Sequence, residues 1–260
     1  LLSLAEIEAL APTHKTVRCK GCSNACLLTV NDFGRDPATG VRRRFITGNR
    51  CEKGESLGAG TEKSDVPNLF EWKSRRLFDA YEPIPAEDAC GTVGIPRALN
   101  LYENYPFWFT FFTKLGYRVV LSDPSTKKTY EAGIESMPSE SVCYPAKLSH
   151  GHIMNLLAKE GDDAVDFIWM PCSKWERQED ETAGNHFNCP IVASYPEALR
   201  LNIDELRGGD VPLLTPWLPY DSKEHLKGRL FVELGQNLAA AAGRHGAPLT
   251  ADEVAAAVEA

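Results

Sequence analysis

The sequence predicts an α/β protein: a mostly parallel open sheet with helices on both faces, a small N-terminal four-cysteine β-hairpin module, and C-terminal helices. Two observations lead to this class. From residue 90 onward, short apolar segments that end near Pro or Asp alternate with longer helical segments, which is typical of a parallel sheet. Before them, Cys19, Cys22, Cys26 and Cys51 follow the spacing C-x2-C-x3-C-x24-C.

Residues 1–57 form the predicted cysteine-rich metal-binding hairpin module. Residues 1–10 read as a short helix that ends before Pro12. Residues 27–30 read as a strand, 32–40 as a turn, and 41–47 as the returning strand that leads to Cys51. Residues 58–89 are rich in Pro, Glu and Lys without a sustained period, so we expect a linker, with Leu69, Phe70 and Trp72 as apolar anchors that dock it.

Residues 90–210 form the predicted α/β domain. Its expected strands are 92–95, 117–121, 166–170 and 191–194, and its expected helices are 104–115, 127–134, 146–159 and one from 196. Residues 211–260 form a C-terminal helical segment, with helices at 222–244 and 250–260. Thr250 and Glu253 have the spacing of a capping box at the start of the last helix.

Composition excludes several classes of protein. A net charge of −8 argues against a nucleic-acid partner, and we interpret the basic run Arg42–Arg44 as a solvated face. We find no apolar run of transmembrane length and no signal peptide, so no membrane association is expected. Eight cysteines without an export signal indicate a reducing compartment, and we expect a cytoplasmic location.

The cysteines of the hairpin module predict a metal centre. Thiolates are preferred ligands of zinc and of iron–sulfur clusters. Structural zinc usually takes paired C-x2-C turns, whereas here three cysteines share one turn and Cys51 stands apart, which favours a [4Fe-4S] cluster. Zinc at the same four residues is the alternative, and a disulfide framework is the third reading.

A second set of cysteines stands near the ends of predicted elements. Cys172 follows a strand, Cys143 lies in a loop that leads into a helix, and Cys189 precedes the segment 191–194. Ligands of open α/β sheets gather at the carboxyl ends of strands, which suits Cys172 and Cys143 better than Cys189. The alternative is three separate buried cysteines that pack as small apolar side chains.

Several short stretches carry a resemblance to a known family. They are residues 93–99 (VGIPRAL), 140–147 (ESVCYPAK) with the HGH of 150–152, 170–172 (MPC) and 188–190 (NCP). They resemble the activase-related part of CoA-substrate-specific enzyme activases, which are relatives of the 2-hydroxyacyl-CoA dehydratase system of anaerobes. The resemblance covers nearly the whole chain.

This resemblance implies a flavodoxin/Rossmann-like domain and iron–sulfur chemistry. In the related dehydratase subunits three cysteines hold a cluster, and Cys143, Cys172 and Cys189 are the matching candidates for a second iron–sulfur cluster. The implied partners are other domains of a longer activase-type protein or a dehydratase-like protein. The chain has no glycine-rich phosphate loop, so the resemblance does not extend to ATP hydrolysis.

The hairpin module has a second, shorter resemblance. Its cysteine spacing with Cys51, Lys53 and Gly54 is similar to the N-terminal [4Fe-4S] module of molybdopterin oxidoreductases. About 40 residues match, and nothing after Gly60 resembles a pterin-binding domain. This supports a cluster without pterin.

Three functions follow as hypotheses, and whether the chain is an enzyme stays open. The first is an iron–sulfur electron-transfer module of an activase. The second is a zinc-stabilised structural or docking module without redox activity. The third is a dehydratase-like or reductase-like domain that acts on a CoA thioester at an open iron site on the second cysteine set.

Overall fold

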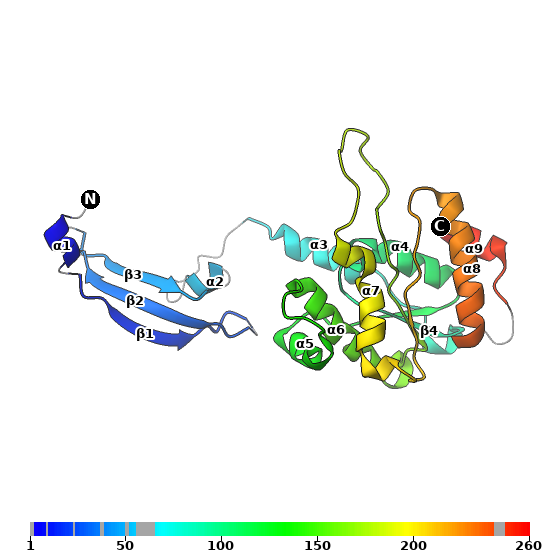
Figure 1. Cartoon of the computed structure of the whole chain (residues 1–260), viewed down its shortest axis with the longest axis horizontal. Coiled ribbons are helices and arrows are strands. Elements are labelled where there is room, and N and C mark those ends of the chain that lie inside the picture. Colours follow the sequence, from blue (N-terminus) through cyan, green and yellow to red (C-terminus); the bar gives the residue numbers. More distant parts are fainter. Residues whose placement is uncertain are drawn as a thin grey trace. The chain divides into compact units, whose positions relative to one another are not determined.

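The computed structural model describes residues 3–8, 10–22, 24–36, 39–49, 52–55, 66–241 and 248–260 (Figure 1). The chain divides into two compact units, Leu1–Pro67 and Asn68–Ala260. The boundary falls inside the segment 58–89. The class of fold predicted from the sequence is confirmed: a parallel sheet with helices follows a small antiparallel sheet.

The first unit is an antiparallel sheet with strand order β1-β2-β3. Its strands are β1 (Thr13–Arg18), β2 (Leu27–Arg35) and β3 (Arg42–Thr47), and the short helices α1 (Leu4–Glu8) and α2 (Glu52–Glu55) stand before and after them in sequence. The predicted hairpin is formed by β2 and β3. Strand β1 is not evident in the sequence, because Val17 is its one aliphatic side chain.

The described part of this unit has almost no hydrophobic core. Among its described residues, Cys19, Leu28 and Gly54 are the buried ones, and most side chains of β1 and β3 are exposed. A three-stranded sheet with so little buried apolar surface needs another source of stability, such as a bound metal or a partner.

The second unit contains a parallel sheet with strand order β5-β4-β6-β7. The strands are β4 (Thr92–Ile95), β5 (Arg118–Leu121), β6 (Phe167–Trp169) and β7 (Leu213–Leu214). The helices are α3 (Leu69–Phe78), α4 (Leu101–Lys114), α5 (Lys127–Ala132), α6 (Tyr144–Leu157), α7 (Pro190–Asn202), α8 (Lys223–Ala241) and α9 (Ala251–Glu259). Short 3-10 turns lie in the connections, at Ala86–Asp88, Ile134–Ser136, Gly161–Asp163 and Asp204–Leu206.

The strand order creates a switch point between β4 and β6. The connection from β4 through α4 leads to β5 on one side. The connection through α6 leads from β5 back past β4 to β6, and the connection through α7 leads on to β7. Because parallel crossovers are right-handed, α4 covers one face of the sheet, and α6 and α7 cover the other. The loops that leave β4 and β6 diverge at this point, which is where open α/β sheets bind ligands.

The core of the second unit is aromatic. On α4, Trp108, Phe111 and Phe112 are fully buried. The ring centroids of Trp108 and Trp169 lie 5.0 Å apart, and those of Phe112 and Phe167 lie 5.9 Å apart, both edge to face. These contacts pack α4 directly against β6 on one face of the sheet.

One predicted strand is wrong. Residues 191–194 belong to helix α7, and the fourth strand of the sheet is β7, whose two residues lie between Pro212 and Pro216. Pro190 occupies the first turn of α7, where its missing N–H costs nothing and its fixed φ suits a helix. The β-branched pair Ile191 and Val192 suggested a strand, but it is compatible with this helix.

The predicted anchors of the connecting segment are also wrong. Leu69, Phe70 and Trp72 lie in helix α3 and are exposed, and Phe70 is 88% exposed. Helix α3 instead buries Phe78, whose ring packs against Tyr102 and Tyr105 of α4.

The C-terminal helices are confirmed, and so is the capping box. The backbone N–H of Glu253 donates to Oγ1 of Thr250 at 3.2 Å, and the backbone N–H of Thr250 donates to Oε2 of Glu253 at 2.8 Å. Within the described ranges, no helix combines the length and the apolar character that crossing a bilayer requires.

Helix α6 packs very closely on α5. A Cβ built at Gly151 would overlap the carbonyl oxygen of Thr129, so this crossing requires glycine. The neighbouring His150 and His152 are buried. Their ring nitrogens lie 2.8–2.9 Å from hydroxyl oxygens, those of Ser136 and Tyr195 around His150 and those of Ser122 and Ser125 around His152. Both histidines are therefore held within the packed helix layer.

We predict that Gly151→Ala destabilises the second unit by about 2–4 kcal/mol, because α5 and α6 must move apart to admit the methyl group. The measurement is the free energy of unfolding in denaturant. The matched control is Gly228→Ala in α8, where a Cβ meets open space and alanine should stabilise by up to about 1 kcal/mol. Equal effects of the two substitutions would contradict the close crossing.

We also predict that acidification weakens the second unit between about pH 6.5 and pH 4. Burial lowers the pKa of His150 and of His152 from 6.5 to about 4, so the unfolded chain binds more protons in this window. Stability is therefore present above the unfolded pKa and falls as the pH drops, by up to about 1.4 kcal/mol per pH unit for each histidine. The variants His150→Gln and His152→Gln should flatten the slope of unfolding free energy against pH.

Candidate functional site

A closed turn joins β1 to β2 and carries three of the predicted ligands. The backbone N–H of Cys19 donates to the carbonyl of Cys26 at 2.8 Å, which continues the strand pairing past Arg18 and Leu27. Ala25 has a left-handed backbone with φ of 44°, and its N–H donates to the carbonyl of Cys22 at 3.3 Å. The eight residues from Cys19 to Cys26 thus form a hydrogen-bonded loop at one end of the sheet.

One backbone N–H in this turn points at sulfur. The N–H of Gly21 donates to Sγ of Cys19, with an N–S distance of 3.4 Å. Cys19 is buried, Cys26 is half-buried and Cys22 is exposed. An N–H···S hydrogen bond two residues along the chain stabilises negative charge on sulfur, which is the charge state that binds metal.

Strand β3 ends at the same end of the sheet as this turn. Thr47 pairs with Thr29 near the start of β2, and Gly48 follows with φ of 82°, so close to Leu27 that a Cβ would overlap the Leu27 carbonyl. Gly54 is buried against Leu28 and Asn49. Cys51 itself lies outside the described residues. Gly48 and Gly54, which stand before and after it in sequence, lie close to Leu27 and Leu28, the two residues that follow the turn.

The described residues do not form a complete metal site. Across the ranges that the structure covers, no three cysteine, histidine or carboxylate side chains lie close enough to hold one metal ion. The grouping of Cys19, Cys22 and Cys26 with Cys51 therefore stays a prediction.

The second cysteine set lies at the carboxyl edge of the parallel sheet. Cys143 is the N-cap residue of α6 and Cys189 is the N-cap residue of α7, and both side chains are exposed. Cys172 follows β6 and pairs with Trp217 in an isolated parallel bridge. The sequence analysis put Cys189 at the start of a strand; because it starts a helix instead, it lies at the same edge as the other two.

Cys172 differs from the other two in its environment. Its side chain is fully buried, and burial raises the pKa of its thiol to about 11, with the nearby Glu197 acting in the same direction. Near α6, burial and the neighbouring Cys143 raise the pKa of Tyr195. All three cysteines are among the described residues, and their side chains are not gathered into one metal-binding group. Their binding of a second cluster stays a prediction.

The chain between Cys172 and Cys189 leaves the sheet and returns. Trp175 and Phe187 form an antiparallel bridge within this excursion, and the N–H of Asn188 donates to the carbonyl of Lys174 at 2.9 Å. The side-chain amide of Asn188 also donates to the carbonyl of Ser173 at 3.1 Å. These bonds bring the residue after Cys172 next to the residue before Cys189.

Glu176 fastens this excursion to its surroundings. Its carboxylate accepts hydrogen bonds from Asn188 at 2.8 Å, from the hydroxyl of Ser173 at 3.3 Å and from Asn104 of α4 at 3.4 Å. The acidic run 176–181 gives no hint of this role in the sequence. The long gap between the end of β6 and the next helix start was the available signal.

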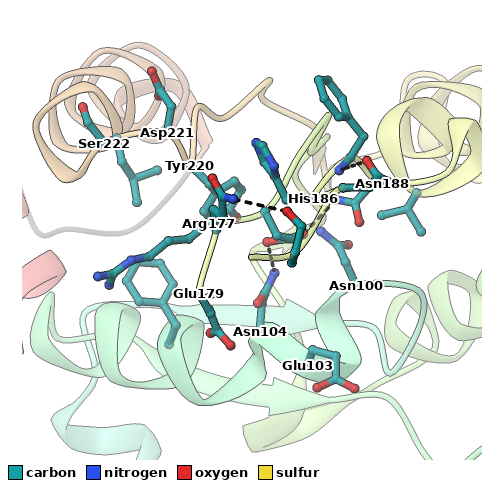
Figure 2. Close-up of a pocket in the computed structure, with 18 of the residues that line it drawn as sticks. Asn100, Glu103, Asn104, Arg177, Glu179, His186, Asn188, Tyr220, Asp221 and Ser222 are labelled. Carbon is teal, nitrogen blue, oxygen red and sulfur yellow. Dashed lines mark hydrogen bonds between the residues drawn. The ribbon is translucent and has the colours of Figure 1, made fainter. Parts of the chain in front are cut away.

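A cleft of about 1170 Å³ opens at the switch point beside this excursion. Figure 2 shows that α4, the excursion and the start of α8 all supply side chains to it. The labelled residues are Asn100, Glu103, Asn104, Arg177, Glu179, His186, Asn188, Tyr220, Asp221 and Ser222. Carboxylates outnumber basic side chains in the lining, which disfavours a polyphosphate ligand such as the nucleotide part of CoA.

Histidine is a common metal ligand, but the contacts of His150 and His152 do not favour that role. Each ring has both nitrogens at hydrogen-bond distance from hydroxyl groups inside the protein. They pack within the helix layer and position α6.

Comparison with known proteins identifies the family. A family model described as "CoA enzyme activase uncharacterised domain" matches residues 92–260, which span the parallel sheet and the C-terminal helices. No curated protein and no solved structure matches the chain. Since the model covers more than half of the sequence, this chain belongs to the CoA enzyme activase uncharacterised-domain family.

Proposed function

We propose that this protein is an iron–sulfur electron-transfer module of a CoA enzyme activase system, which acts together with a dehydratase-like partner protein. The family membership supports the system, and the cysteine turn supports the chemistry. The observation that carries the proposal is the closed Cys19–Cys26 turn with an N–H donated to the sulfur of Cys19, at the end of the sheet where β3 also finishes.

The donor set suits a [4Fe-4S] cluster. Cys19, Cys22, Cys26 and Cys51 would hold it, and when bound it supplies reversible one-electron transfer. The protein contributes the N–H of Gly21, whose hydrogen bond stabilises the negative charge on the sulfur of Cys19. The burial of Cys19 and the half-burial of Cys26 limit the access of water to their sulfurs. No pterin is needed for this role.

The thin core of the first unit supports the same proposal. With three buried residues in its described part, the unit lacks the apolar burial that stabilises a domain of this size. Metal binding then supplies much of its folding free energy, as it does in small metal-bound domains.

A second candidate is a zinc-stabilised docking module without redox activity. The exposed Leu27 and Phe45 on the first sheet favour a docking role, and four cysteines also suit zinc. Anaerobic purification followed by iron, sulfide and zinc analysis separates the two candidates. Iron with matching sulfide supports the cluster, whereas stoichiometric zinc without sulfide overturns it.

We predict that changing any one of the hairpin cysteines to serine removes most of the metal of the first unit and unfolds residues 15–55, because the described part of the sheet buries too few residues to hold it alone. Metal content and limited proteolysis of the first unit measure this. Cys90→Ser is the matched control: Cys90 packs against the core of the second unit, and its loss should leave metal content unchanged. Full metal content in the single variants of Cys19, Cys22 or Cys26 would refute the grouping.

We further propose that Cys143, Cys172 and Cys189 hold a second iron–sulfur cluster at the carboxyl edge of the sheet. The shared edge supports this, and so does the excursion that returns Asn188 to Ser173. The triple serine variant should lose about four iron atoms per chain while the first unit stays resistant to proteolysis. Unchanged iron content would mean that the three cysteines are separate packing residues. Cys90→Ser again serves as the control.

A further inference from the structure

The sheet of the first unit has two unlike faces. Residues that pair across antiparallel strands share a face, so the register assigns each side chain. One face carries Leu28, Val30 and Ile46, and Gly54 of α2 packs against Leu28 there. The opposite side, the open face, is made by His14, Thr16 and Arg18 of β1, by Leu27, Thr29, Asn31 and Phe33 of β2, and by Arg43, Phe45 and Thr47 of β3.

Large apolar side chains stand on the open face without cover. Leu27 is 59% exposed and Phe45 is 62% exposed. The rings of Phe33 and Phe45 pack edge to face, with centroids 5.6 Å apart. Neighbouring apolar groups of this kind, rimmed by polar residues, mark a protein interaction surface.

The surroundings of this face are basic. Residues 13–48 contain seven Lys or Arg and two Asp, although the whole chain carries a net charge of −8. Of these charged residues the open face carries Arg18 and Arg43, and Arg43 lies 3.8 Å from the carboxylate of Asp36. Asp32 binds Arg42 and Arg44 on the covered side, at 2.7 and 3.1 Å. On the open face, Arg18 has no carboxylate at ion-pair distance among the described residues. A surface of this charge complements an acidic partner.

The open face adjoins the cysteine turn. Arg18 and Leu27 are the paired residues that directly flank Cys19 and Cys26. A guanidinium nitrogen of Arg18 lies 3.4 Å from the carbonyl oxygen of Ala25 within the turn. A protein that covers Arg18 and Leu27 therefore also lies against the turn.

From these observations we infer that the open face is the docking surface for an acidic electron-carrier protein, which reduces the metal centre held by the turn. The inference rests on the proposed function for the nature of that centre. In the transfer, the carrier loses one electron and the centre gains one, and no covalent bond forms or breaks. The exposed rings supply apolar contact, and Arg18 supplies attraction and orientation.

Binding is tested first, with the full chain and a fluorescently labelled flavodoxin, a small acidic flavoprotein, at low ionic strength. Arg18→Glu should weaken binding about tenfold, and Phe45→Ala should weaken it by a similar factor. The matched control is Lys15→Glu, the same change of charge on the same strand, but opposite Val30 on the covered face; its effect should stay below about twofold. Added salt should weaken binding of the unchanged protein.

Equal effects of Arg18→Glu and Lys15→Glu would overturn the inference, because only the overall charge would then matter. Failure to bind, with self-association in sedimentation velocity that Phe45→Ala abolishes, would overturn it in favour of a second copy of the chain on this face.

Electron transfer is tested next, by following reduction of the centre by reduced flavodoxin and, separately, by dithionite. Arg18→Glu should slow the first reaction about tenfold at low salt and leave the second unchanged. If neither reductant changes the spectrum, the proposed redox function fails. If both reduce the centre and Arg18→Glu slows neither, the function stands and the docking inference fails.

Discussion

The second unit depends on one buried aromatic layer between helix α4 and the parallel sheet. Trp108 and Phe112 contact Trp169 and Phe167 across this layer, and none of the four is exposed to solvent. The layer fixes α4 over β4 and β6. The loops that leave the carboxyl ends of these two strands then diverge. The cleft, the excursion after Cys172 and the helix starts at Cys143 and Cys189 all lie where that divergence places them.

The first unit follows a different physical principle. Its strands pair well, but the described part buries three residues, so pairing alone leaves it marginal. The metal proposed for the cysteine turn and the protein proposed for the open face would each add to its stability. This links its proposed chemistry to its folding, because the same four thiolates that would carry electrons would also hold the chain together.

Sequence patterns were sufficient for elements whose signals were local. Val93, Val119 and Ile168 lie in short apolar runs, and all three proved to be in one parallel sheet. The placement of Cys143 before a helix and of Cys172 after a strand was correct. Residues 191–194 were misjudged because a β-branched run is compatible with a strand and with a proline-started helix. Strand β7 escaped notice because two residues between prolines carry no periodicity. The cleft could not be predicted, since it depends on hydrogen bonds that the carboxylate of Glu176 accepts from Asn104 and Asn188, which lie far from it in the sequence.

The contrast between Cys172 and the two helix-capping cysteines has a consequence for the protein in air. Oxidation of a thiol to sulfenic acid needs the thiolate and access for the oxidant, and Cys172 lacks both, since it is fully buried and its pKa is about 11. Cys143 and Cys189 are exposed. Oxidative damage at this edge therefore begins at the two outer cysteines, and the inner one survives as an intact thiol after its neighbours have been modified.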